Sequence, residues 1–106
     1  MKVQNITSNN GNKIANQFVI TEVDKLGYKK KYFQSYNSMI VKISEVLNFN
    51  VKENKYISDF KIELDQKYWN YSNTTGKYRN IFLNETIKDT RAKIKNGTYI
   101  LTDLNK

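Results

Sequence analysis

Cysteine, histidine and proline are absent from this sequence of 106 residues. Without cysteine there are no disulfide bonds and no thiolate nucleophile, and without cysteine and histidine there is no ordinary zinc site. Catalytic groups that need a histidine base, such as Ser-His-Asp, are excluded as well. No apolar run approaches the roughly 18 residues of a membrane span, and residues 1–5 lack the apolar segment of a signal peptide. We therefore expect neither a membrane protein nor a secreted one.

Carboxylates are the remaining candidates for acid–base catalysis, and three lie close together at Asp59, Glu63 and Asp65. Alternation along a strand leaves Glu63 and Asp65 on one face as separate surface charges. Carboxylates from a single strand neither flank a substrate, as glycosidase acids do, nor surround a metal ion with oxygen ligands. The sequence predicts a protein that is not an enzyme and that carries no metal and no cofactor.

Negative charge is scarce: 18 Lys and Arg oppose 10 Asp and Glu, giving a formal net charge of +8. Only Arg79 and Arg91 are arginines. Lys, Asn, Ile and Tyr are abundant and all have AT-rich codons, so the lysine excess has two explanations. It reflects either a genome of low GC content or selection for an anionic partner such as nucleic acid. The excess is spread evenly, because residues 1–53 and 54–106 each carry +4.

Hydrophobic periodicity and turn residues predict one domain spanning residues 1–106. The expected strands are 3–7, 13–23, 28–35, 38–44, 60–64 and 98–101, with Asn10-Gly11 as a two-residue hairpin turn. Ser72 or Asn73 can cap a helix that runs to Leu83, and a second helix from 85 to 95 stops at Asn96-Gly97. The segment 45–58 stays open between the start of a helix and an inserted loop. The pattern predicts an α+β fold, an antiparallel sheet of four to six strands with two C-terminal helices on one face.

A basic and aromatic segment occupies the third expected strand. Alternation places Tyr28, Lys30 and Tyr32 on one face, with Lys29 and Lys31 on the other. Nucleic-acid bases could stack on the tyrosines while the lysines hold phosphates. The competing interpretation is a solvated edge strand whose lysines prevent edge-to-edge pairing.

A second aromatic cluster, Tyr68-Trp69-Asn70-Tyr71, precedes the first helix. Alternation would place Tyr68 with Asn70, and Trp69 with Tyr71. Trp69 is either part of the core or, if exposed, an anchor for a binding partner.

The segment Thr74-Thr75-Gly76-Lys77 contains the Gly-Lys pair of a nucleotide-binding loop. It lacks that loop's earlier glycine and its following Ser or Thr, so a nucleotide loop is excluded. A helix N-terminus with hydroxyls and Lys77 could still hold a phosphate, and a simple helix cap is the alternative.

Two stretches, Phe33–Ile43 and Tyr68–Leu83, resemble a group of small, uncharacterised proteins of tailed phages, crAss-like phages among them. The pattern pairs a strand of the form F-x-S-Y-x-S/T-x-I with a downstream Y-W-x-Y-S-x-T-T-x-K segment and an amphipathic helix. The opening and closing segments fit as well, whereas 45–58 fits poorly and suggests an insertion. The resemblance implies a phage gene product that acts in the cytoplasm of the infected bacterium. It implies no activity.

The shared segments contain several hydroxyl side chains that a fold could bring together beside Lys77. Such a cationic, hydroxyl-rich patch would suit phosphates or a protein backbone. The residues of this expected polar patch are Ser35, Ser38, Ser72, Thr74 and Thr75.

Two functions remain for a small protein of this kind. The first is sequence-independent binding to the backbone of DNA or RNA, with cations on phosphates and aromatic rings on bases. The second is an inhibitor that binds a host defence protein, such as an anti-CRISPR or other anti-defence factor. The sequence leaves the oligomeric state open. The nucleic-acid contacts expected under the first function are Lys29, Lys30, Lys31, Lys77, Arg79, Tyr28, Tyr32 and Trp69.

Overall fold

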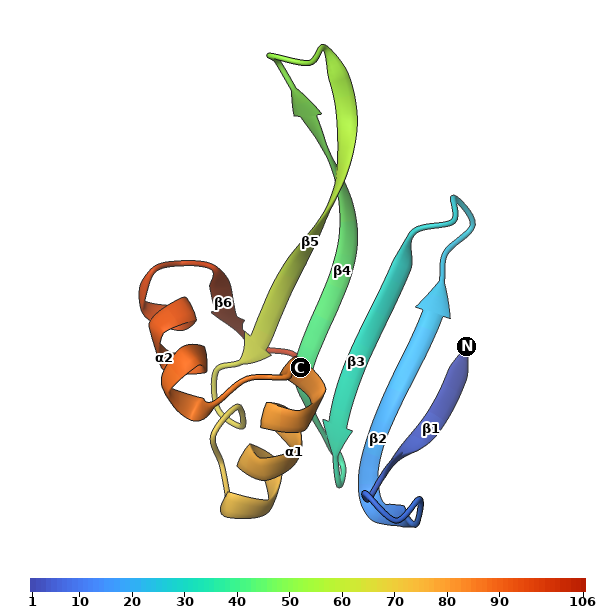
Figure 1. Ribbon diagram of the computed structural model, residues 1–106, viewed down its shortest axis with the longest axis vertical. Coiled ribbons are helices and arrows are strands. Elements are labelled where there is room, and N and C mark those ends of the chain that lie inside the picture. The colour runs from blue at the N-terminus through green and yellow to red at the C-terminus, as the bar shows by residue number, and fades with distance from the viewer.

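The computed structural model describes residues 1–106 as one six-stranded sheet with two helices near the C-terminus (Figure 1). The strands follow one another across the sheet in chain order, and every neighbouring pair is antiparallel except the last. The predicted α+β class and its sheet with two C-terminal helices are confirmed. The elements are β1 (Lys2–Thr7), β2 (Lys13–Val23), β3 (Lys29–Ser35), β4 (Ser38–Asn50), β5 (Lys55–Asp65), α1 (Asn73–Leu83), α2 (Ile87–Lys95) and β6 (Tyr99–Thr102).

The first hairpin differs from the two-residue turn that Asn10-Gly11 predicts. Ser8 to Asn12 form a five-residue loop, in which Gly11 N–H donates to the Ser8 carbonyl at 2.9 Å. Gly11 has a φ of +80°, a conformation that glycine adopts without the Cβ clash of other residues. The true two-residue turn is Tyr36-Asn37 between β3 and β4, where Tyr36 takes a φ of +56°.

The segment 45–58 is mostly strand, so both expected conformations, helix start and loop, are wrong. β4 continues to Asn50, a four-residue turn follows, and β5 begins at Lys55. β3 pairs with β4 only as far as Ser44, and β6 pairs with β5 only from Ile62. Residues 45–61 therefore form a two-stranded ribbon without neighbours, which we call the arm. The arm projects from the rest of the molecule, which we call the body (Figure 1).

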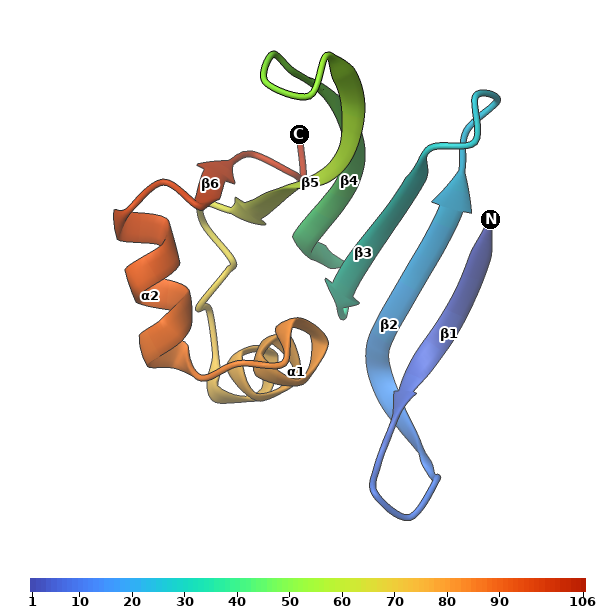
Figure 2. The ribbon, with the colours of Figure 1, turned by 45° about the horizontal axis from the view of Figure 1, so that its top comes forward.

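Both helices begin at side-chain caps, of which the sequence predicts the first. Ser72 Oγ accepts a hydrogen bond from Thr75 N–H at the start of α1. Thr86 and Asp89 form a reciprocal capping box at the start of α2. The two helices connect β5 to the parallel strand β6, a connection that parallel pairing requires because a tight turn cannot make it. Figure 2 shows both helices on the same side of the curved sheet.

The core lies between this side of the sheet and the helices. Phe33 of β3 is fully buried and stacks on Phe82 of α1, with ring centroids 5.7 Å apart. β4 contributes two consecutive buried residues, Ile40 and Val41, because a bulge opposite Phe33 and Gln34 leaves Ile40 as an extra residue. The full set of buried apolar residues is Ile6, Phe33, Ile40, Val41, Leu64 and Tyr99. All six belong to the body, so the arm contributes nothing to the core.

Candidate functional site

β3 divides the basic and aromatic segment between the two faces of the sheet. Phe33 packs on α1 and Ser35 Oγ lies 3.1 Å from Thr75 Oγ1, so the odd-numbered residues of β3 face the helices. Lys31 follows this pattern, with its Nζ 5.5 Å from the centre of the Phe82 ring. Lys30 and Tyr32 lie on the opposite, open face. The three lysines therefore cannot act as one row.

Acidic partners occupy the open face beside these residues. Tyr32 Oη donates to Glu22 at 2.8 Å, and Glu22 is also the cross-strand neighbour of Lys30. Burial, the hydrogen bond to Glu22 and the nearby negative charge raise the pKa of Tyr32 to about 12. Lys42 lies 6.0 Å over the Tyr32 ring and has Glu63 as its own cross-strand neighbour. The Tyr32 ring, expected as a stacking platform, thus already has Glu22 at its hydroxyl and Lys42 over its face.

The aromatic cluster before α1 is a turn, so its expected alternation is wrong. Tyr68 and Tyr71 contact each other edge to face at 5.3 Å, although alternation would separate them. Trp69 is half-buried against the core and is covered by the guanidinium of Arg79, 5.3 Å from its ring. Of the two interpretations of Trp69, the structure supports the core residue rather than the exposed anchor.

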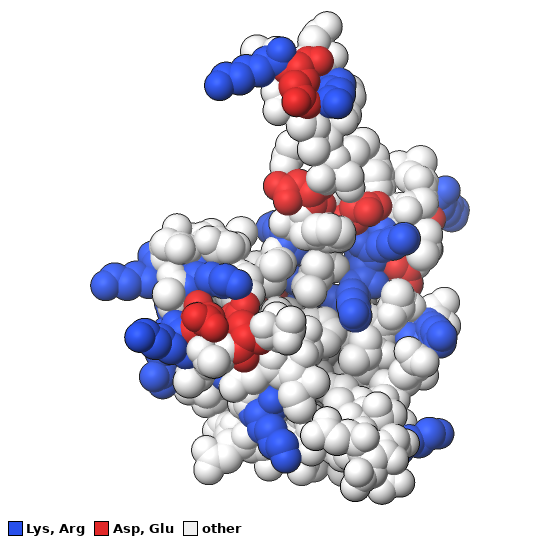
Figure 3. Space-filling view, in the orientation of Figure 1, with Lys and Arg blue, Asp and Glu red and all other residues white.

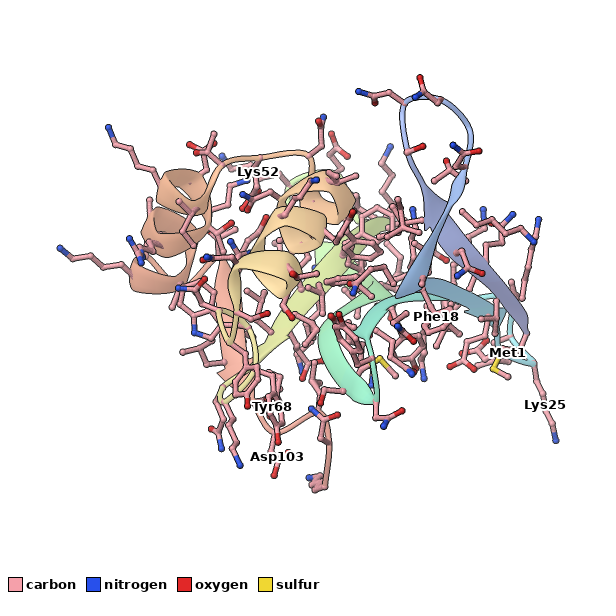
Figure 4. The ribbon with its side chains drawn as sticks, turned by 90° about the horizontal axis from the view of Figure 1, so that it is seen from below. Met1, Phe18, Lys25, Lys52, Tyr68 and Asp103 are labelled. Atoms are coloured by element: carbon pink, nitrogen blue, oxygen red, sulfur yellow. The ribbon has the colours of Figure 1, made fainter.

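Asp65 fixes the start of this turn at the end of β5. Its Oδ2 accepts hydrogen bonds from Lys67 and Tyr68 N–H at 3.1 and 2.8 Å, and its Oδ1 accepts from Leu104 N–H at 2.9 Å. In the view of Figure 4, Tyr68 and Asp103 lie close together, in agreement with the hydrogen bonds of Tyr68 and Leu104 to this one carboxylate. Although burial alone would raise the pKa of Asp65, these hydrogen bonds hold it below its usual value. Asp65 is structural and is not part of an acidic pair.

Arg79 is buried, so its expected direct contact with phosphate is wrong. Only 1% of the residue is exposed. One terminal nitrogen donates to the Trp69 carbonyl at 2.7 Å and to Asn70 Oδ1 at 3.2 Å, and the other donates to Asn80 Oδ1 at 2.9 Å. All these acceptors are neutral, and Nε has no partner. Arginine is rarely buried without a carboxylate, so the sequence gives no warning of this placement.

The burial of Arg79 leaves a fixed positive charge at the start of α1. Burial, opposed by Glu85 and assisted by the neighbouring Arg91, lowers the pKa of Arg79. A guanidinium nevertheless stays protonated in proteins. Glu85 is the nearby acid, but it forms its ion pair with Lys93 and not with Arg79. Burying an ion without a directly bonded counter-charge costs several kcal/mol. An anion bound nearby would recover part of this cost.

A pocket of about 350 Å³ opens above this charge, and we call it the basic pocket. Three of its lining residues are cations, Lys77, Arg79 and Arg91, and none is acidic. Gly76 forms part of the wall, and a Cβ there would lie 3.7 Å from both terminal nitrogens of Arg79. Because Gly76 has no side chain, little protein separates the Arg79 guanidinium from the pocket. The complete lining is Asn70, Ser72, Asn73, Gly76, Lys77, Arg79, Asn80, Ile87 and Arg91.

The backbone adds to the positive potential of the basic pocket. Asn73 begins α1, and the N–H groups of a first helical turn have no acceptor inside the helix. The helix dipole favours an anion at this end, and the first turn of α1 contains no acidic residue. The pocket thus combines oriented amide donors, two exposed cations and one buried cation. This is the chemistry of an anion site.

The expected polar patch lies on the other side of the α1 cap. Ser35, Ser38, Ser72 and Thr75 line a separate pocket of about 350 Å³ with Tyr36, Tyr68 and Tyr71, whereas Thr74 and Lys77 do not line it. Ser72 Oγ donates to Thr75 Oγ1 at 3.2 Å, and Thr75 Oγ1 lies 3.1 Å from Ser35 Oγ. These hydroxyls bind one another. They lock α1 onto β3 and so hold the basic pocket in place.

Lys77 is among the residues that the sequence predicts to contact a phosphate, whereas Arg91, the other exposed cation of the pocket, is not. Arg91 lies fourteen positions away on α2, and only the packing of the helices brings it to the pocket.

Neither helix is long and apolar enough to cross a membrane. No group of three or more acidic side chains could hold a metal ion.

Comparison with known proteins assigns the chain to a family but supplies no activity. The chain belongs to a family of unknown function, DUF8033. The match covers residues 1–97, and therefore the arm and the whole basic pocket. No curated protein and no solved structure matches the chain. The expected membership of an uncharacterised family is confirmed, and the family supplies no function for the chain.

Proposed function

We propose that the protein is not an enzyme and that it binds the sugar–phosphate backbone of a nucleic acid without reading its sequence. The observation that carries this proposal is the basic pocket, in which three cations and a helix N-terminus converge without any acid. A phosphate in the pocket would contact Lys77, Arg91 and those amides of the first turn of α1 that the Ser72 cap leaves free. It would also lie over the buried charge of Arg79 and add a negative charge beside a guanidinium whose hydrogen-bond acceptors are all neutral.

Further cations continue from the basic pocket along α2. Lys88, Arg91 and Lys95 are exposed and spaced by three and four residues, so they form one stripe on the helix. Together with Lys77 they provide four cations for successive phosphates. Arg91 is the only exposed arginine, and bidentate recognition of guanine by arginine is the commonest base-specific contact. The composition of this surface therefore favours backbone contact over base readout.

The resemblance to small phage proteins adds a biological setting to the proposal. We place the activity in the cytoplasm of a phage-infected bacterium, where the partner would be phage or host nucleic acid. Inhibition of a host defence protein is the alternative function. A pull-down from nuclease-treated host lysate tests that alternative, which predicts a stoichiometric host protein that persists after the nucleic acid has been digested.

Salt-dependent binding to fluorescent oligonucleotides tests the proposed function. Four phosphate contacts predict a log–log slope of affinity against salt of about −3.6 for duplex DNA and about −2.8 for single strands. The double variant K77Q/R91Q should reduce these slopes to about −1.8 and −1.4 and should weaken binding at least tenfold at about 50 mM salt.

The matched control is K2Q/K25Q, which removes one exposed lysine at the start of β1 and one in the turn after β2. Neither lysine lines the basic pocket, and the control has the same net charge as K77Q/R91Q. It should change affinity less than about threefold, because only long-range attraction is lost. An equal loss in both double variants, or no binding by the wild-type chain at about 50 mM salt, would refute the proposed function.

A further inference from the structure

The arm exposes an apolar face that nothing in the chain covers. This face continues the side of the sheet that the helices cover in the body. It carries three cross-strand pairs, which are Phe49 with Tyr56, Leu47 with Ser58, and Glu45 with Phe60. The four large side chains are 46% (Leu47), 50% (Phe49), 67% (Tyr56) and 57% (Phe60) exposed. Phe49 and Tyr56 contact each other edge to face at 5.2 Å. A two-stranded ribbon alone is marginally stable in water, and a contiguous apolar face of this kind marks an interaction site.

The net charge of the arm distinguishes it from the body. Residues 45–61 contain three acids and three lysines, so the arm is neutral. The formal charge of +8 therefore belongs wholly to the body. Contact between two bodies meets strong like-charge repulsion, whereas contact between two arms does not. Among the surfaces of this chain, the arm is the one that can approach its own copy without a net electrostatic penalty.

The charges of the arm are also ordered along its length. Lys52 and Lys55 lie at the tip with Glu53, whereas Glu45 and Asp59 lie at the base with Lys61. The tip has a net charge of +1 and the base −1. Figure 3 shows both signs at the tip and acidic side chains lower on the arm. When two arms are aligned antiparallel, each positive tip meets the negative base of the other.

We propose that the arm is a dimerisation element, and that two copies of this chain pack the apolar faces of their arms antiparallel about a two-fold axis. The same patch serves both copies, as an isologous interface requires. Phe49 and Tyr56 of one copy would cover Leu47 and Phe60 of the other, with the two ribbons about 10 Å apart as in stacked sheets. Glu45 would lie against Lys52 of the partner's tip.

The available area agrees with a stable dimer. A large aromatic side chain buries about 150–250 Å², so four half-exposed side chains offer roughly 400 Å² per copy. Two copies offer roughly 800 Å² of apolar area, and with an apolar share near 60% the whole interface comes to roughly 1,300 Å². This value lies at the lower end of specific interfaces, which begin near 1,200 Å². Full coverage of the two apolar faces would therefore reach the size of a small specific interface.

Dimerisation is independent of the proposed function, because the arm contributes no residue to the basic pocket. It would place two basic pockets on one particle, and a nucleic acid long enough to reach both would gain avidity. A chain that binds nucleic acid but stays monomeric would contradict dimerisation alone. A chain that dimerises without binding nucleic acid would contradict the proposed function alone.

Sedimentation velocity between about 1 and 100 µM tests the dimer, because the mass of a reversible dimer depends on concentration. The wild-type chain should approach about 25 kDa, twice its own 12.5 kDa. F49S/Y56S should weaken dimerisation at least a hundredfold, since it removes the central aromatic pair. Its circular dichroism spectrum should stay that of the folded body, because the arm lies outside the core.

Two exposed apolar residues outside the arm provide the control. V23S/L26S removes side chains that are 59% and 81% exposed in and after β2, and it should leave the dimer unchanged. A wild-type chain that is monomeric at the highest concentration, or a dimer that F49S/Y56S does not disturb, would overturn the proposal. If the wild-type chain is monomeric, the apolar face of the arm would instead be a candidate surface for binding a host protein, as the alternative function requires.

Charge reversal tests the antiparallel arrangement. E45K and K52E should each weaken the dimer severalfold, because each places like charges where tip meets base. The double variant E45K/K52E should recover most of the loss, since it restores opposite charges with their positions exchanged. If the two losses add instead of cancelling, tip and base are not in contact and the antiparallel arrangement is wrong.

Discussion

The same two strands, β4 and β5, run through two different environments. In the body, Val41 pairs with Leu64, and both are fully buried beneath the helices. In the arm, Phe49 pairs with Tyr56 in the same ladder and on the same face, yet both are at least half exposed. Pairing and alternation are continuous, and only the neighbouring elements differ. A strand pattern therefore specifies which side chains share a face, while burial depends on what the fold places against that face.

Removing apolar volume should have the largest effect, and only in the body. L64A leaves a cavity under the helices and should lower the free energy of unfolding by about 2–5 kcal/mol. F60A, in the arm, should change it by less than about 0.5 kcal/mol because its side chain is already solvated. Urea denaturation of both variants, at a protein concentration low enough to keep the chain monomeric, measures the two changes in unfolding free energy. Similar losses in the two variants would mean that the arm is part of the cooperative core.

Buried and exposed carboxylates give the next comparison. Glu85 accepts hydrogen bonds from Thr90, Lys93 and Tyr99 at 2.6–2.7 Å, and its side chain is 6% exposed. E85Q should cost about 1–3 kcal/mol at neutral pH. E53Q, in the arm turn, removes a solvated ion pair with Lys55 and should cost less than about 1 kcal/mol.

The cost of E85Q should depend on pH. Although burial alone would raise the pKa of Glu85, its hydrogen bonds hold it below the usual 4.5. The unfolded chain therefore takes up a proton at a higher pH than the folded chain does, and the stabilisation is complete above about 4.5 and is lost as the pH falls below it. Denaturation series at pH 7 and pH 3 should show wild type and E85Q converging in acid.

A smaller effect is expected at alkaline pH. Burial and the hydrogen bond to Glu85 raise the pKa of Tyr99 to about 12 from its ordinary 10.0. Its contribution to stability is complete below pH 10 and is lost as the pH rises toward 12. Y99F cannot ionise, so it should lose less stability across this window than wild type in thermal melts. Y56F, which alters an exposed arm residue, is the matched control and should follow wild type.

Backbone opening provides the most sensitive comparison, without any substitution. Amide hydrogens of β4 within the body, such as Val41 N–H, should exchange at rates close to global unfolding. Those of the arm should exchange far faster in dilute, monomeric protein, because no third strand or helix covers them. Arm protection that rises with protein concentration would support the dimer, and uniform protection along β4 in the monomer would contradict the division into arm and body.

Much of the fold could be predicted because its signals are local. Ser72 caps α1 through a hydrogen bond to a residue three positions away, and the last strand follows a glycine stop. The strands of the arm were harder to predict. Asn48, Asn50 and Asn54 are typical of loops, and the arm buries too little apolar surface to give a clear strand pattern. Its alternation, apolar at Leu47 and Phe49, was the signal available.

The candidate site was predicted only in part. The Gly-Lys pair and its hydroxyls pointed to a phosphate near Lys77, and the structure brings Arg91 to the same pocket. Arg79 was placed wrongly because sequence alone treats a charged residue on an amphipathic helix as solvated. Only the surrounding carbonyl oxygens of Trp69, Asn70 and Asn80 make its burial tolerable.

The sequence by itself determined the absence of cysteine and histidine chemistry, the order of strands and helices, and the excess of positive charge. Each of these depends on composition or on interactions within a few residues. Tertiary structure decided where that charge acts: it set Glu22 beside Lys30 and Tyr32, buried Arg79, and left the arm neutral and uncovered. Electrostatic and hydrophobic energies depend on distance and solvent exposure, and both are set by elements far apart in the chain.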